Sequence, residues 1–461
     1  MQTYNAETTV AAISTPPGKG GVALIRVSGR EAVEIAARCI KLRSGKPLAD
    51  LPARHAAYGD LYFEGEPIDD VVVTVFRAPH SYTGEDTVEV ACHGGTLLTR
   101  TALAAILAAG AEQAGAGEFT RRAVLSGRLS LTEAEAISCL LEAKSLAQIR
   151  LSTHRSRSRL AGELASLYED LLSLISTMYA KIDYPEEDLA DLTNDEILTA
   201  IEKMRSRTDE LLASYRTGRA VNEGIPTVLC GTPNVGKSAL YNALAGEELA
   251  IVTDYAGTTR DVLSTTLPLG QVLLRLHDTA GLREATDPVE RIGVNRSRSR
   301  MEESELLLAV FDRSRPLTDE ERVFLAECKE KAQAVIILLN KCDLPAATDE
   351  TVFADFPHVL RVSAKTREGF AELTTLVESL FTDGNIKLGE EAIVASARQY
   401  AALRKAGEAF ERAADAFAAG LPADIAASDL EVALAALAEL EGRTVNEEIV
   451  AEIFRRFCVG K

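Results

Sequence analysis

Residues 231–238, with the sequence GTPNVGKS, match the GxxxxGK[ST] pattern of a phosphate-binding loop. Gly231 and Gly236 allow backbone N–H groups to turn inward around phosphate oxygens. Lys237 would neutralise charge on the β- and γ-phosphates, and Ser238 would ligate Mg²⁺. The alternative is a chance glycine-rich turn, which the motifs further along the chain make weak.

Three more short motifs follow the phosphate-binding loop. DTAG at 278–281 would hold Mg²⁺ through water and sense the γ-phosphate. In NKCD at 340–343, Asp343 can accept hydrogen bonds from N1–H and the 2-amino group of guanine. Adenine offers neither donor, so this motif predicts that GTP is preferred to ATP. SAK at 363–365 can meet the guanine O6 through a backbone N–H.

The segment GTTRD at 257–261 lies between the phosphate-binding loop and DTAG. Thr259 is the candidate for the second protein ligand of Mg²⁺, in a switch segment that the γ-phosphate orders; a polar turn is the alternative. The residues predicted to bind GTP are Asn234, Val235, Gly236, Lys237, Ser238, Ala239, Thr253, Asp254, Tyr255, Ala256, Gly257, Thr258, Thr259, Asp278, Thr279, Ala280, Gly281, Asn340, Lys341, Asp343, Ser363, Ala364 and Lys365.

Leu282 follows DTAG, at a position where many small GTPases carry a Gln that orients the attacking water. A Leu side chain can neither donate nor accept a hydrogen bond, so hydrolysis must recruit another polar group. The run 283–291 offers candidates, among them Arg283 and Glu290. On spacing alone, a solvated surface charge is the favoured interpretation of Glu290.

These motifs need strands to position them, and strand-like runs precede most of them. The runs at 227–230, 272–277, 306–311, 335–339 and 360–362 alternate with helical segments. Such alternation predicts a mostly parallel sheet covered on both faces, with ligands at the carboxyl ends of the strands.

Helical segments flank this part on both sides. Apolar residues spaced by three or four run from Leu160 to Ile182, before Pro185, and again from Leu403 to Phe417. We therefore predict a Ras-like GTPase domain inserted into a helical domain. Short strand-like runs and glycine-rich turns before residue 122 predict a small α+β domain. The predicted boundaries are 1–122 for the N-terminal domain, 123–218 and 384–461 for the two helical halves, and 219–383 for the GTPase domain.

The composition is that of a multidomain globular protein of 461 residues, with 46% hydrophobic residues. The net charge of −19 disfavours non-specific nucleic-acid binding, so an RNA partner requires a local patch or another protein. Seven scattered cysteines, without a CxxC pair, exclude a disulfide framework and favour the cytoplasm. We see no secretory signal and no apolar run of membrane-spanning length.

Longer segments resemble the MnmE (TrmE) family of tRNA-modifying GTPases along nearly the whole chain. They are ISTPPGKGGVALIRVSG at 13–29, TGEDTVEVACHGG at 83–95, GEFTRRAVLSGRLSLTEAEAI at 117–137, IDYPEED at 182–188, AIVTDYAGTTRDV at 250–262, DTAGLREATDPVERIGV at 278–294 and FCVGK at 457–461. The inserted GTPase domain is also the architecture of that family.

The resemblance implies a homodimer formed through a folate-binding-like N-terminal domain that holds 5-formyl- or methylene-tetrahydrofolate. It places Arg26, Glu89, Arg128 and Lys461 near the folate. Arg128 stands where compared family members have Lys, which keeps the charge and changes the donor geometry. Taken without the resemblance, each of the four would be interpreted as a surface charge.

In the GTPase domain, the resemblance implies stimulation by K⁺, which takes the electrostatic part that an arginine finger plays elsewhere. Asn234, Thr253, Tyr255 and Thr258 would surround K⁺, with Thr253 and Tyr255 contributing backbone oxygens. Glu290 would orient the attacking water, and the switch would be supported by Arg283. With Lys237, these two form the predicted catalytic set.

The reaction implied by the resemblance forms a (carboxymethyl)aminomethyl group at carbon five of the wobble uridine of certain tRNAs. A tetrahydrofolate would supply the one-carbon unit, and an FAD-dependent partner, MnmG (GidA), would perform the redox steps in a heterotetramer or larger complex. Nucleotide-dependent opening and closing of paired GTPase domains would drive the modification reaction.

Two other functions stay open at the level of sequence. One is a GTP-switched ribosome-assembly or signalling factor, although its usual basic KH-type appendage with GxxG is not seen in this sequence. The other is a folate enzyme for a small molecule, timed by the GTPase domain. Cys458 could be a nucleophile or a small packed residue, and Cys342 has no assigned role. His93 is better interpreted as a turn-stabilising or packed residue than as a ligand-binding one.

Overall fold

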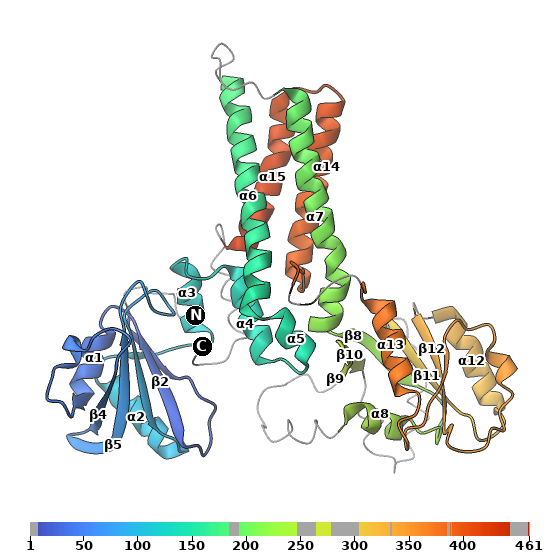
Figure 1. The fold of residues 1–461 in the computed structure, drawn as a ribbon, viewed down its shortest axis with the longest axis horizontal. Helices are drawn as coiled ribbons and strands as arrows, with labels where there is room; N and C mark the ends of the chain where they lie inside the picture. Colours follow the sequence, from blue (N-terminus) through green and yellow to red (C-terminus); the bar gives the residue numbers. More distant parts are fainter. Residues whose placement is uncertain are drawn as a thin grey trace. The chain divides into compact units, whose positions relative to one another are not determined.

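A computed structural model describes residues 8–183, 193–246, 264–277, 304–331, 334–384, 388, 390–442 and 460. The chain divides into two compact units, Met1–Ser138 with Ala438–Lys461, and Cys139–Leu437. Each unit is described by itself below (Figure 1).

The first unit is built on a seven-stranded, mostly antiparallel sheet in the order β3-β4-β5-β6-β2-β1-β7. Its strands are β1 Val10–Ile13, β2 Val22–Ser28, β3 Ile40–Leu42, β4 Ala56–Phe63, β5 Glu66–Phe76, β6 Thr87–His93 and β7 Glu112–Gln113. Helices α1 (Ala32–Cys39) and α2 (Thr96–Ala108) bury apolar side chains in the same core as the central strands, and α3 (Glu118–Leu125) follows. The prediction of an α+β domain is confirmed.

Helices of 6 to 30 residues form the helical part of the chain. They are α4 Leu131–Leu141, α5 Leu146–Leu151, α6 His154–Asp183, α7 Asn194–Asn222, α14 Ala397–Ala418 and α15 Ala423–Glu441. The predicted apolar stripe of α6 is buried from Leu160 to Met178, and a capping box of Thr193 and Glu196 starts α7. In the described part of the chain, no helix combines the length and the apolar composition needed to cross a membrane.

Helices α7 and α14 come from opposite sides of the GTPase sequence and lie side by side (Figure 1). The rings of Tyr215 and Tyr400 stack with their centroids 4.3 Å apart. Ser214 on α7 accepts a hydrogen bond from the backbone N–H of Val394, which precedes α14. Helices that precede and follow the α/β segment in the sequence therefore pack on each other.

The GTPase part holds a six-stranded sheet in the order β13-β12-β11-β8-β10-β9. The strands are β8 Ile225–Cys230, β9 Ser264–Leu269, β10 Val272–His277, β11 Leu306–Asp312, β12 Ala334–Asn340 and β13 Val359–Arg361. All pairs are parallel except the β9–β10 hairpin. The five predicted strands are present, which confirms a mostly parallel α/β domain.

Both faces of this sheet are covered. Alternate residues of β11 enter two different cores, one shared with α8 (Lys237–Ala245) and α13 (Phe370–Phe381), the other with α12 (Asp319–Lys331). Every residue of β11 is buried, which is why this strand is a continuous apolar run in the sequence. The carboxyl ends of β8, β11 and β12 then present their polar loops at one edge of the sheet.

Candidate nucleotide-binding site

The phosphate-binding loop joins β8 to α8 and lies tightly against its neighbours. A Cβ on Gly231 would lie 2.4 Å from the carbonyl oxygen of Val310 on β11, and one on Gly236 would lie 2.3 Å from Asn340 Nδ2. Gly236 also has a φ of +98°, which L side chains rarely adopt. Both glycines of the motif are therefore required by close approach of the backbone, as expected for a loop that cradles phosphates.

Lys237 begins α8 and reaches back across the loop. Its Nζ donates to the carbonyl oxygens of Gly231 and Thr232, both at 2.9 Å. The ammonium is thereby held at the mouth of the loop, where Ser238 is half-buried and Asn234 is exposed. A cation and the positive end of a helix are thus at the same place, which suits a phosphate.

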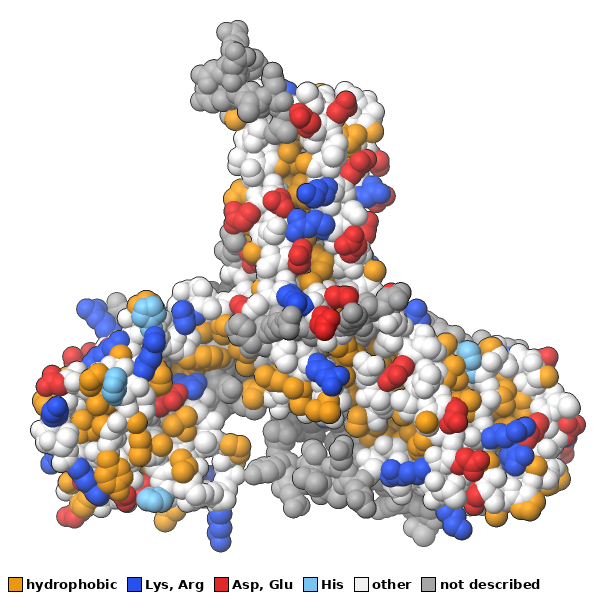
Figure 2. Space-filling view, viewed as in Figure 1, with side chains coloured by type: hydrophobic (Ala, Val, Ile, Leu, Met, Phe, Trp, Pro, Cys, Tyr) orange, Lys and Arg blue, Asp and Glu red, His pale blue; other side chains and the backbone are white. Residues whose placement is uncertain are grey.

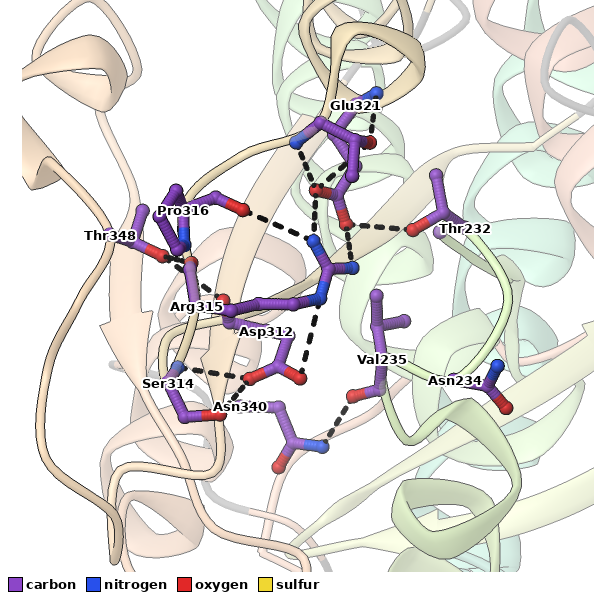
Figure 3. Close-up of polar contacts among 12 residues, drawn as sticks. Thr232, Asn234, Val235, Asp312, Ser314, Arg315, Pro316, Glu321, Asn340 and Thr348 are labelled. Atoms are coloured by element: carbon purple, nitrogen blue, oxygen red, sulfur yellow. Dashed lines mark hydrogen bonds and ion pairs between the residues drawn. The ribbon is translucent and has the colours of Figure 1, made fainter.

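Asn340, the last residue of β12, connects three of the predicted motifs. Its Nδ2 donates to the carbonyl oxygen of Val235 in the phosphate-binding loop at 2.8 Å. Its Oδ1 accepts the backbone N–H of Ala364 in the SAK motif at 3.2 Å. A single buried amide therefore fixes the spacing between the loop for phosphates and the loops for the base. Figure 3 shows its bond to Val235.

The base-reading loop is ordered by its own hydrogen bonds. Ser363 Oγ donates to Asp343 Oδ1 at 2.7 Å and accepts the backbone N–H of Thr366 at 3.1 Å. Lys341 donates from Nζ to the carbonyl oxygen of Asn234 at 3.2 Å. The structure thus brings together the predicted residues of three motifs, including the exposed carboxylate of Asp343.

Asp312 is a residue of this site that the sequence analysis did not select. It ends β11, and its Oδ2 accepts Lys341 Nζ at 2.6 Å while Ser314 donates twice to Oδ1. Burial opposes ionisation, but the bonds from Lys341 and Ser314 outweigh it and lower the pKa of Asp312. The signal that finds the other motifs, a polar residue closing a central parallel strand, could have found this one.

Many predicted residues lie outside the described part of the chain. They are Thr253, Asp254, Tyr255, Ala256, Gly257, Thr258, Thr259, Asp278, Thr279, Ala280, Gly281, Arg283, Glu290, Cys458 and Lys461. The DTAG motif directly follows the end of β10 at His277.

Three of the four residues predicted to bind folate, Arg26, Glu89 and Arg128, lie in the described part of the chain. Arg26 on β2 and Glu89 on β6 are cross-strand partners, and the guanidinium donates to Glu89 Oε1 at 3.0 and 2.8 Å. The same guanidinium lies 5.2 Å from the ring centroid of Tyr82 and 5.5 Å from that of Phe119. Arg26 and Glu89 are therefore brought together among aromatic side chains.

A third predicted residue, Arg128, and the residue that precedes Lys461 each lie against a neighbouring segment of this unit. The side chain of Arg128 lies beside Gly84, since a Cβ there would be 3.3 Å from Arg128 Cγ. Gly460, which precedes Lys461, packs against the backbone of Ile13 on β1, the neighbour of β2.

Buried Arg122 is a second residue that the sequence analysis missed. It donates to the carboxylates of Glu85 and Glu118 and to the carbonyl oxygen of Thr8. These bonds tie α3 to the GED turn and to the segment before β1. The Arg and the two acidic residues lie in the quoted family segments, but only the fold shows that they meet.

His93 is not packed in a core, because its side chain is 62% exposed, but it hydrogen-bonds to a neighbouring carboxylate at the end of β6. Its ring Nδ1 lies 2.8 Å from Asp69 Oδ1, and its backbone N–H donates to the other oxygen of the same carboxylate. The hydrogen bond with Asp69 raises the pKa of His93. Asp70 is the third member of this group, which closes the end of the β5–β6 pairing.

Comparison with known proteins covers nearly the whole chain. The family models "GTP-binding protein TrmE N-terminus" and "MnmE helical domain" match residues 9–128 and 131–458. The chain is 40% identical to the tRNA modification GTPase MnmE of Geobacillus thermodenitrificans, over 98% of this chain and 99% of that protein. It is also 40% identical to the protein of that name from Symbiobacterium thermophilum, over 99% of this chain and all of that protein.

Among solved structures, the chain is similar to the FeoB G-domain from Methanococcus jannaschii. The identity is 25%, the match covers 34% of this chain and 97% of that chain, and the TM-score is 0.24. The two family models and the full-length relatives agree with the motifs and with the fold. The chain therefore belongs to the MnmE (TrmE) family of tRNA modification GTPases.

Proposed function

We propose that this chain hydrolyses GTP and that hydrolysis serves the modification of tRNA. The observation that carries the first half is the junction at Asn340, which joins the phosphate loop to the two loops that read guanine. Family membership carries the second half, because the full-length relatives are named tRNA modification GTPases.

The base is read by Asp343 and the phosphates by the loop around Lys237. The Asp343 carboxylate would accept from N1–H and the 2-amino group of guanine, and Ser363 orients it. Lys237 and the N–H groups at the start of α8 would neutralise the phosphates. We assign Mg²⁺ to Ser238 and Thr259, and the switch role to the DTAG motif.

We further propose that K⁺ stimulates hydrolysis. Asn234 lies at the exposed tip of the phosphate loop, so its amide oxygen could reach an ion beside the phosphates. Thr253, Tyr255 and Thr258 would complete the shell, and Glu290 would orient water with the support of Arg283. A monovalent cation there would stabilise charge that develops between the β- and γ-phosphates.

A reduced folate fits the residues of the first unit. Both bonds from Arg26 end on Glu89 Oε1, so Oε2 is the oxygen that would accept from the pterin N–H donors. Arg128 and Lys461 would take the carboxylates of the glutamate tail. Next to Tyr82, the buried hydroxyl of Ser81 makes no hydrogen bond within the described residues, which suits a polar ligand.

The folate would supply the one-carbon unit, and this chain would hold it and time its use. We propose that the product is a (carboxymethyl)aminomethyl group at carbon five of the wobble uridine. A homodimer of this chain would act with the FAD-dependent partner MnmG (GidA) in the cytoplasm.

GTP turnover by the purified protein tests the catalytic part of this proposal. We expect clearly faster hydrolysis in KCl than in NaCl of the same ionic strength, and at least tenfold slower hydrolysis by Glu290→Ala with GTP affinity retained. Equal rates in the two salts would remove K⁺ from the mechanism. A normal rate for Glu290→Ala would remove that residue from it.

A further inference from the structure

Glu321, in the first turn of α12, is a buried carboxylate with contacts to the phosphate loop. Its side chain is 1% exposed. Oε1 accepts Thr232 Oγ1 at 2.7 Å and Arg315 Nη2 at 2.8 Å, while Oε2 accepts Arg315 Nη1 and the backbone N–H of Thr318, each at 2.9 Å (Figure 3). The phosphate loop and the loop that leads into α12 therefore meet on one carboxylate.

A buried carboxylate is costly unless hydrogen bonds and an opposite charge compensate for lost hydration. Burial opposes the ionisation of Glu321, but the bonds from Arg315, Thr318 and Thr232 outweigh it, and the pKa lies below its usual value. The group is therefore a fixed negative charge at neutral pH. Its position in the first turn of a helix adds a favourable interaction with the helix dipole.

Part of this arrangement is a capping box that serves α12 alone. The N–H of Glu321 donates to Thr318 Oγ1, and the carboxylate accepts the N–H of Thr318 in return. This reciprocal pair uses Oε2. The bond from Thr232 ends on Oε1 and contributes nothing to the cap, so capping does not explain it.

Thr232 is the second residue of the phosphate loop, and it also contacts the catalytic lysine. Its carbonyl oxygen accepts a hydrogen bond from Lys237 Nζ at 2.9 Å. A continuous chain of contacts therefore runs from the Glu321 carboxylate through the hydroxyl and the carbonyl of Thr232 to the ammonium of Lys237.

We propose that Glu321 is a positioning residue for GTP hydrolysis and that it acts through Thr232 on Lys237. By holding the Thr232 hydroxyl, Glu321 fixes the carbonyl that orients the ammonium toward the β- and γ-phosphates. A pre-oriented cation costs no reorganisation when charge develops in the transition state. Arg315 keeps the carboxylate in place, and the same guanidinium lies 3.8 Å from Asp312.

This inference rests on the proposed GTP hydrolysis and is tested with the full-length protein. Thr232→Val removes the hydroxyl with little change in shape and leaves the capping box intact. We expect kcat/KM for GTP to fall about tenfold, which corresponds to about 1.4 kcal/mol, and the melting temperature to fall by a few degrees at most, because Arg315 still donates to the same carboxylate oxygen. Thr232→Ser should restore the parent kinetics.

Thr318→Ala is the matched control, because it removes a side chain from the other half of the same carboxylate site. We expect it to lower the melting temperature by a few degrees and to leave kcat/KM within twofold of the parent. Glu321→Gln, which keeps the shape of the side chain, should lose kcat/KM like Thr232→Val and stability like Thr318→Ala.

Three results would overturn the proposal. The first is a Thr232→Val protein with parent kinetics. The second is a loss that Thr232→Ser does not restore, and the third is an equal kinetic loss in Thr318→Ala, which would assign the effect to helix capping. If the parent protein does not turn over GTP, the proposed function fails first, and this inference fails with it.

Discussion

The candidate nucleotide site contains one exposed carboxylate, Asp343, and two buried ones, Asp312 and Glu321. Asp343 is exposed, and we propose that it binds the base. Asp312 is buried and bonded to Lys341, and Glu321 is buried and bonded to Arg315. A buried carboxylate that accepts several charged or polar hydrogen bonds has little freedom to move. These residues can therefore hold their loops in place before a nucleotide arrives.

The first prediction at this scale concerns the base. Asp343→Asn replaces one acceptor oxygen by an amide N–H donor. This would place a donor against the N–H donors of guanine, where no hydrogen bond can form. We expect GTP affinity to fall about 10- to 100-fold, which corresponds to loss of charge-assisted hydrogen bonds. Xanthosine triphosphate carries a carbonyl at carbon two and should be bound better by the variant than by the parent. Competition binding with the two nucleotides checks this, and an unchanged preference for guanine would exclude Asp343 from reading the base.

The second prediction concerns pH. Because the pKa of Glu321 is lower in the folded state, its stabilising effect is present in full above the usual glutamate pKa. That stabilisation is lost as the pH falls through the lower folded value. We expect Glu321→Gln to unfold about 2 kcal/mol more easily at neutral pH, with the difference shrinking below about pH 4.5.

Urea unfolding followed by circular dichroism measures this difference, since the chain has no tryptophan. Arg315→Lys is a useful companion, because it keeps the charge and loses the two-point contact. A difference between parent and Glu321→Gln that grows as the pH falls would contradict the assigned pKa shift.

At the scale of the helices and strands, the hydrophobic pattern predicts most of what is observed. The sequence predicts the five strands of the GTPase sheet because their apolar runs are buried on both faces, as in β11. It does not reveal β9, the edge strand, since Pro268 lies within it and a proline argues against a strand in sequence. An edge position tolerates the proline, and that position is known only from the fold.

Helix α7 supplies a prediction at this scale. In the interior of α7, a Cβ on Gly218 would lie 2.0 Å from the carbonyl oxygen of Val394. The glycine thus makes room for the segment that leads into α14. We expect Gly218→Ala to destabilise the protein by about 2 kcal/mol, although alanine favours a helix by about 1 kcal/mol.

Gly162→Ala in α6 is the matched control, because a Cβ there meets no atom within 4 Å. It should stabilise the protein by about 0.5–1 kcal/mol. The melting temperature should fall for Gly218→Ala, where close packing dominates. It should rise for Gly162→Ala, where helix propensity dominates. A stabilised Gly218→Ala protein would contradict the packing of α7 against residue 394.

Across the whole molecule, sequence motifs select candidate site residues, but they do not reveal the contacts that hold those residues in position. Lys237, Asn340 and Asp343 are found from short motifs, because binding of phosphates and a base would dictate their residue types. The contact of Thr232 with Glu321 joins residues far apart in the chain, and the sequence pattern of each segment is complete without it. Such supporting contacts arise from tertiary packing and need the fold to be seen.

The net charge is a property of the whole molecule. With a net charge of −19, the chain cannot rely on overall attraction to bind tRNA. In Figure 2, acidic and basic side chains are interspersed over the helical part on the face shown. We therefore expect that tRNA is met through a local surface together with the FAD-dependent partner.

We propose that GTP hydrolysis by this chain serves tRNA modification, and the modified nucleosides of tRNA test this directly. Nucleosides from the tRNA of cells lacking the gene are measured by mass spectrometry. We predict loss of the aminomethyl-type wobble uridines, restored by the intact gene and not by a Lys237→Ala copy. An unchanged nucleoside profile in the deleted cells would contradict a role in tRNA modification and favour a GTP-switched assembly factor.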